Sequence, residues 1–174
     1  MATEQQHYRV VRKEDSFEIR FYPPANIASV DVAGGYDRMR NEGFRELAGY
    51  IFGGNSRGEK IAMTAPVIMD LKDENQAGTM SFVMPSSFDM NAKPAPQSSR
   101  ITFAETEPAY VAALTFGGFA SIKDLEEHKA RLLKLLEEKH IKYDIHAEYM
   151  LYDPPYKLLM RRNEVAVKLI DFNE

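Results

Sequence analysis

An internal repeat at a spacing of 84 residues constrains this chain more than any other feature of its sequence. Residues 24–34 (PANIASVDVAG) align without a gap on residues 108–118 (PAYVAALTFGG). Phe17 falls on Ile101 at the same spacing, and a helical pattern follows each copy. Because self-similarity of this kind marks a repeated structural unit, we expect two copies of one small fold.

Each copy predicts the order strand, strand, helix, strand, strand. Alternating apolar and polar residues over 17–22 are typical of a half-buried strand whose apolar face is Phe17, Ile19 and Phe21. The first helix is expected over 36–52, and the second begins at Ser121, where Asp124 completes a modest capping box. The other strands are expected at about 8–11, 27–32, 60–71, 80–85, 143–152 and 164–170.

The length of 174 residues suits a single domain with a sizeable core. We expect repeat halves at about 8–85 and 100–171, joined by a Pro-rich linker at 86–99. The fold class is then α+β, with the duplicated unit forming a distorted antiparallel β-barrel flanked by two helices. Closure would remove exposed sheet edges. Two separate small sheets are the alternative, although each half alone is near the size at which a core becomes marginal.

The segment 44–67 joins the end of the first helix to an apolar strand through a glycine-rich loop. Phe44, Leu47, Ala48 and Ile51 have the spacing of a single helix face. The strand that follows is too apolar for a solvated edge, so at least one of its faces is expected to be covered. A helix on a sheet beside a glycine break forms either a pocket or plain core, and the sequence leaves both open.

Composition and charge narrow the classes of function. The chain has no cysteine, which excludes disulfides, a thiol nucleophile and a cysteine-based metal site. A net charge of −4 without a basic block argues against nucleic acid or an anionic membrane as the main partner. The sequence shows no signal-peptide core and no membrane-spanning run, so we expect a cytoplasmic protein without membrane insertion.

No residue pattern predicts catalysis. Residues 54–58 (GNSRG) match the nucleophile-elbow string around Ser56, but an elbow needs a strand before the serine and a helix after it. The predicted order here is the reverse. No two acids stand out, and the four histidines lack metal-ligand spacing: His7, His128, His140 and His146. We therefore expect a binding protein with no catalytic residue and no metal site, rather than an enzyme.

Four stretches of the chain resemble the SOUL/haem-binding protein family, and they occur in that family's order. They are EIR at 18–20 with Tyr22 and Pro24, LAGYIFG at 47–53 with Asn55, KIAMTAPV at 60–67, and YDPP at 152–155 with RNEV at 162–165. The resemblance extends over nearly the whole chain. The family's fold is a duplicated unit in a distorted antiparallel barrel with two helices, which agrees with the repeat. Bacterial effector-binding modules share it.

The resemblance implies non-catalytic binding of haem or a related tetrapyrrole, as a carrier or buffer. In that family the porphyrin is taken to dock on the first helix, with basic or phenolic groups near its propionates. By position, this implies cofactor-binding roles for Arg40, Asn41, Phe44, Ala48, Tyr152 and Lys157. The alternative is an effector-binding module for another flat hydrophobic or cationic small molecule. Phe44 and Ala48 could also be core residues that face the sheet.

Two positions depart from the family's pattern. Some members carry a candidate axial histidine directly after Glu-Ile-Arg, where this chain has Phe21, and some carry a methionine where it has Ala48. We therefore expect weak or no axial ligation of haem iron. Affinity would come from apolar burial at ~25 cal/mol per Å² and from ion pairs at the propionates.

Overall fold

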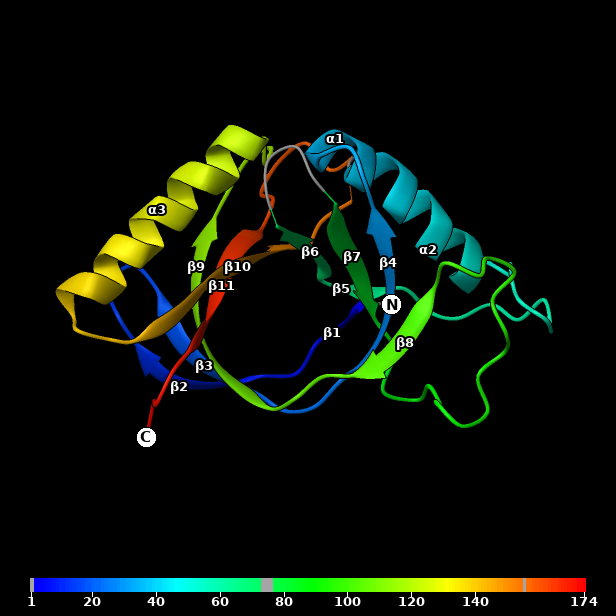
Figure 1. The fold of residues 1–174 in the computed structure, drawn as a ribbon, viewed down its shortest axis with the longest axis horizontal. Coiled ribbons are helices and arrows are strands. Elements are labelled where there is room, and N and C mark those ends of the chain that lie inside the picture. Colours follow the sequence, from blue (N-terminus) through cyan, green and yellow to red (C-terminus); the bar gives the residue numbers. More distant parts are fainter. Residues whose placement is uncertain (1, 73–76, 155) are drawn as a thin grey trace. The chain divides into compact units, whose positions relative to one another are not determined.

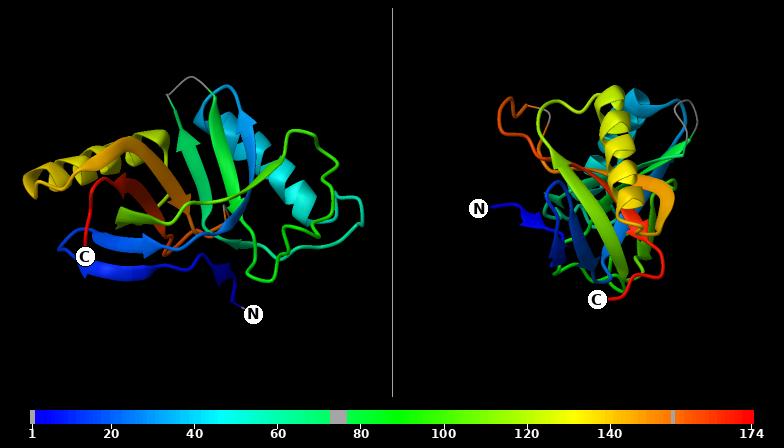
Figure 2. Two further views of the ribbon diagram at one scale, coloured as in Figure 1. Left: turned by 60° about the horizontal axis from the view of Figure 1, so that its bottom comes forward. Right: turned by 90° about the vertical axis from the view of Figure 1, so that its left-hand side faces the viewer.

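The computed structural model describes residues 2–72, 77–154 and 156–174, which form two compact units. Unit 1 consists of Met1–Gln6 and Pro24–Thr106, and unit 2 of His7–Pro23 and Glu107–Glu174. In each unit a helix lies along one face of an antiparallel sheet (Figures 1 and 2). Among the described residues, no helix is both long and apolar enough to cross a membrane.

The sheet of unit 1 has the strand order β6-β7-β4-β8, and all neighbours are antiparallel. Its strands are β4 (Asn26–Val32), β6 (Val67–Leu71), β7 (Gly78–Val83) and β8 (Thr102–Glu105). A short parallel pair, β1 (Glu4–Gln5) and β5 (Thr64–Ala65), belongs to the same unit. The expected strand over 60–71 is therefore shorter than predicted, since Pro66 lacks an N–H and separates β5 from β6.

The sheet of unit 2 has the strand order β2-β3-β9-β11-β10, again with antiparallel neighbours. Its strands are β2 (Arg9–Lys13), β3 (Glu18–Tyr22), β9 (Ala109–Phe116), β10 (Tyr143–Leu151) and β11 (Asn163–Leu169). The alternation predicted for β3 is only partly correct. Ile19 is buried, but so are Arg20 and Tyr22, while Phe21 is half-buried. The strand is covered on both faces, and one covered face is polar.

The duplication is visible in the strand order of the two units. The strands β6, β7, β4 and β8 of unit 1 correspond to β10, β11, β9 and β3 of unit 2. The first strand of each sequence repeat is exchanged, because β3 pairs with β9 in unit 2 and β8 pairs with β4 in unit 1. The compact units therefore do not coincide with halves at 8–85 and 100–171. Residues 86–99, expected as a linker, lie within unit 1 and bond to its helix-end loop through Ser56 and Gln97.

The predicted α+β class, with antiparallel strands and two helices, is confirmed, but the described strands do not close into a barrel. In the described part of the chain, β2 of unit 2 pairs only with β3, and β8 of unit 1 pairs only with β4. Each is an end strand rather than part of a ring. Charged side chains occupy both edges, such as Arg9, Arg12 and Lys13 in β2 and Glu105 in β8. Charge on an edge strand discourages further pairing, so these sheets can end without closing.

The first helical segment covers 36–51, close to the predicted 36–52, but it contains one irregular turn. It consists of α1 (Tyr36–Arg38), the π-helical turn η1 (Met39–Gly43) and α2 (Phe44–Ile51). Met39 is fully buried against the sheet of unit 1. Gly43 allows a close approach, since an added Cβ would lie 3.2 Å from Val32 Cγ2 and 3.4 Å from Met80 Cβ.

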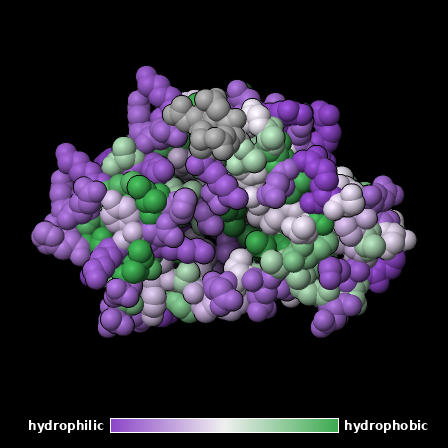
Figure 3. All heavy atoms as spheres, in the orientation of Figure 1, coloured by the Kyte–Doolittle hydropathy of each residue, from purple (hydrophilic) through white to green (hydrophobic). Residues whose placement is uncertain are grey.

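The second helix, α3 (Ile122–Glu138), begins where the sequence predicted. The Ser121 side chain accepts a hydrogen bond from the Asp124 N–H, and the Asp124 carboxylate accepts one from the Ser121 N–H, so the capping box is confirmed. Leu125, Leu132 and Leu136 form its buried face. The outer side of α3 is mainly hydrophilic (Figure 3). Residues 73–76, between the strands expected at 60–71 and 80–85, lie outside the described residues.

Replacing Gly78 tests how closely η1 lies on β7. An added Cβ would lie 2.6 Å from the backbone oxygen of Asp70 and would overlap the methyl group of Met39. Gly78→Ala should therefore destabilise the protein by about 1–3 kcal/mol in urea unfolding. Gly49 in α2 is the matched control, because its added Cβ meets no neighbouring atom of the described chain within 4 Å. Gly49→Ala should stabilise by about 0.5–1 kcal/mol, and equal effects would contradict this packing.

Candidate functional site

The π-helical turn in unit 1 carries the first group of expected site residues. A single π turn within an α-helix changes which side chains share a face, and such turns are frequent at functional sites. Arg40 is half-buried and Asn41 is exposed within this turn. Among the described residues, the Arg40 side chain forms no hydrogen bond or ion pair. Arg38, two residues earlier, differs because it binds Glu42 at 2.8 Å.

Phe44 and Ala48 follow the π turn in α2 and pack towards the sheet of unit 1. The Phe44 ring lies 5.5 Å from the ring of Phe82 in β7, and Phe44 remains half-buried rather than sealed. Ala48 is only 7% exposed. The helical segment thus carries a half-buried aromatic ring and a half-buried guanidinium, while the alanine lies beneath the surface.

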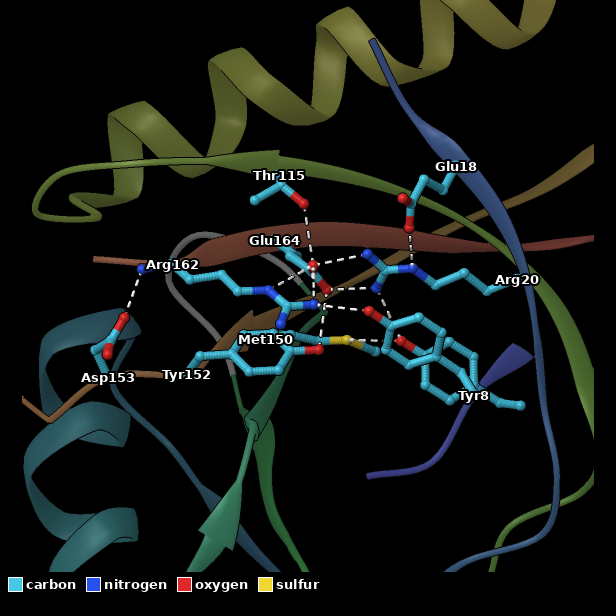
Figure 4. Close-up of polar contacts among 10 residues, drawn as sticks. Tyr8, Glu18, Arg20, Thr115, Met150, Tyr152, Asp153, Arg162 and Glu164 are labelled. Atoms are coloured by element: carbon cyan, nitrogen blue, oxygen red, sulfur yellow. Dashed lines mark hydrogen bonds and ion pairs between the residues drawn. The ribbon is translucent and has the colours of Figure 1, made fainter. Parts of the chain in front are cut away.

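A fully buried carboxylate organises the polar interior of unit 2 (Figure 4). Glu164 in β11 accepts six hydrogen bonds: two from Arg20, two from Arg162, and one each from Tyr152 and Thr115. The shortest, from Arg20 Nη1 to Glu164 Oε2, is 2.7 Å long. A buried carboxylate is tolerated only when paired and hydrogen-bonded, and this one has no free accepting capacity left.

Two arginines are fixed on Glu164 by aromatic rings as well as by charge. The Arg20 guanidinium lies 4.1 Å from the centre of the Tyr8 ring, and that of Arg162 lies 3.8 Å from the centre of the Tyr152 ring. Arg162 also donates to the Tyr8 hydroxyl at 3.0 Å. These cation–π contacts hold the guanidinium planes in place, so the network is rigid as well as neutralised.

The protonation states follow from these contacts. Burial would raise the pKa of the Glu164 carboxyl, but the hydrogen bonds and charges of Arg20 and Arg162 outweigh it and hold that pKa below its usual value. Burial raises the pKa of the Tyr152 hydroxyl well above its usual value. At neutral pH the network therefore contains a carboxylate and a neutral phenol that donates to it.

Tyr152 and Lys157 lie in the loop between β10 and β11. Within this loop the Asp153 carboxylate accepts hydrogen bonds from both Lys157 and Arg162. Asp153 Oδ1 accepts from Lys157 Nζ at 2.6 Å, and Asp153 Oδ2 accepts from the Arg162 N–H at 2.5 Å. Lys157 is therefore partly neutralised, with 41% of its side chain exposed. Pro155, the last residue of the YDPP stretch, lies outside the described residues.

The histidines and Ser56 occupy structural or solvated positions. The His128 ring stacks on Phe116 with ring centres 3.8 Å apart, and its Nδ1 donates to the Asp124 carbonyl at 2.6 Å. His7, His140 and His146 are exposed. Among the described residues, no group of three His, Asp or Glu side chains could hold a metal. The Ser56 hydroxyl accepts from the Ala95 N–H at 3.0 Å and so fixes a loop.

Comparison with known proteins identifies the family. The family model described as SOUL heme-binding protein matches residues 3–168. The chain belongs to the SOUL heme-binding protein family. Curated relatives include heme-binding protein 2 of Homo sapiens, which is 33% identical over 91% of this chain and 80% of the relative. Heme-binding protein 1 of Xenopus laevis is 31% identical over 86% and 82%. The resemblance expected from the sequence is thereby confirmed.

Solved structures of low sequence identity share the fold of this SOUL-family chain. The C-terminal domain of EcmrR superposes with a TM-score of 0.68 at 10% identity, covering 95% of this chain and 99% of that domain. A hydrolase from Listeria innocua gives a TM-score of 0.64 at 11% identity, over 92% and 94%. At such identities these likenesses show the fold alone.

The structure divides the six expected site residues between the two units. Arg40, Asn41, Phe44 and Ala48 lie together on one helical segment of unit 1, whereas Tyr152 and Lys157 share one loop of unit 2. Sequence reasoning missed the network around Glu164. Its charged members Arg20, Arg162 and Glu164 lie within the stretches EIR and RNEV. An arginine in a predicted strand, with a glutamate in another, was the only signal that could have suggested a buried pair.

The Glu164 network predicts a specific loss of stability in acid. The folded-state pKa of Glu164 is lowered. Its contribution to the free energy of unfolding is therefore present above the pKa of the unfolded state, about 4.3, and is lost as the pH falls through the folded-state pKa. Glu164→Gln leaves two arginines without their carboxylate and should cost about 3–5 kcal/mol at pH 7. The free energy of unfolding, measured in urea between neutral and acid pH, should decrease less in the variant than in the wild type as the pH falls.

Glu174→Gln is the matched control for this prediction. Glu174 also accepts from an arginine, Arg9, and from a tyrosine, Tyr110, but all three contacts are at the surface. Its replacement should change stability little. If Glu164→Gln does not fold, Tyr152→Phe removes one donor and should cost about 0.5–1.5 kcal/mol. Identical pH profiles for wild type and Glu164→Gln would contradict the assigned role.

Proposed function

We propose that this chain binds haem or a related tetrapyrrole, as a non-catalytic carrier or buffer. The observation that carries the proposal is membership of the SOUL heme-binding protein family over residues 3–168. It is supported by relatives named heme-binding protein that match most of the chain at 31–33% identity. Haem supplies a flat apolar macrocycle, two propionates and an iron atom. The residues of the chain fit the macrocycle and the propionates.

Arg40 is the residue best suited to a propionate. It is a half-buried cation in the π turn, and it has no ion-pair partner among the described residues. A guanidinium binds a carboxylate through two parallel hydrogen bonds, and this pairing is stronger when the group is partly shielded from water. The neighbouring Asn41 amide is exposed and can donate to the same carboxylate.

Phe44 supplies the apolar contact in this proposal, and Ala48 supplies space. The Phe44 ring is fixed by Phe82 but remains half-buried, so its free edge can contact a macrocycle. Ala48, one turn further along α2, is short and buried. It offers no atom that could ligate iron, unlike the methionine that the family resemblance gives some members.

Tyr152 and Lys157 contribute less than Arg40 in this proposal because both already have partners. The Tyr152 hydroxyl donates to Glu164 at 3.0 Å, and Lys157 Nζ lies 2.6 Å from Asp153. A propionate near Lys157 would have to displace or share with the Asp153 carboxylate. We therefore assign the anion contact of this proposal to the helical segment of unit 1, and we rank Lys157 below Arg40 as an anion-binding residue.

Titration with hemin tests the assignment of Arg40. Arg40→Ala should weaken binding by about tenfold, equivalent to roughly 1.4 kcal/mol, as followed by the Soret absorbance. Arg45→Ala is the matched control: it removes the same side chain from the same helical segment, at an exposed position. It should leave the affinity within about twofold.

Three results would count against the proposal. Absence of saturable one-to-one binding would overturn haem as the ligand, and equal losses in both arginine variants would overturn the role of Arg40. Thermal stabilisation by a flat cationic dye but not by porphyrins would instead favour an effector-binding module, because a ligand that binds only the folded state raises the melting temperature.

Weak or absent axial ligation gives a separate prediction. Phe21, at the position of the candidate axial histidine, packs on Tyr110 with ring centres 5.2 Å apart and offers no ligand atom. Alanine variants of His7, His128, His140 and His146 should each keep the hemin spectrum of the wild type. Iron-free protoporphyrin should bind within about threefold of hemin. A histidine variant with a shifted Soret maximum would contradict this part of the proposal.

A further inference from the structure

We draw no further inference here: the strongest candidate, the surface patch formed by the exposed side chains of Tyr156, Leu158, Leu159 and Met160 in the β10–β11 loop, carries none because nothing in the structure shows what covers it, and because the same loop holds Tyr152 and Lys157 of the proposed haem site.

Discussion

The interaction on which unit 2 depends most is the saturation of one buried carboxylate. Glu164 is fully buried in β11 and accepts hydrogen bonds from β3, from β9 and from both ends of the β10–β11 loop. A charge in such a place is stable only while every lone pair is used. The network therefore fixes the polar face of a strand and the loop at the same time, and it links the core of the unit to its most exposed surface.

The two sequence repeats exchange a strand, and this exchange adds a strand from the other repeat to the sheet of each small unit. Three strands of each sequence repeat stay in one sheet, whereas the strand before them, β3 or β8, pairs with a strand of the other repeat. The exchange also determines which residues meet. Arg20, in the first repeat, reaches Glu164, in the second, across 144 residues of sequence. The buried ion pair of unit 2 is therefore formed by one residue from each repeat.

The two units offer different chemistry to ligands. In unit 1, a half-buried guanidinium without a described partner lies on the same helical segment as a half-buried aromatic ring. In our proposal these two groups bind an anionic, flat molecule. In unit 2, the charged groups around Glu164 are paired with one another, and the β10–β11 loop exposes several apolar side chains.

The sequence by itself determined the repeat, the order of its elements, the capping of α3 and the family, because periodicity, capping residues and short motifs are local properties. Tertiary structure alone decided that β3 and β8 change places, that the sheets end in charged edge strands instead of closing, and that Arg20 lies in the interior. It also decided that Ala48 is covered while Leu158 and Leu159 are not. The physical reason is that burial and charge pairing depend on which distant residues meet, and local patterns of hydrophobicity do not encode this.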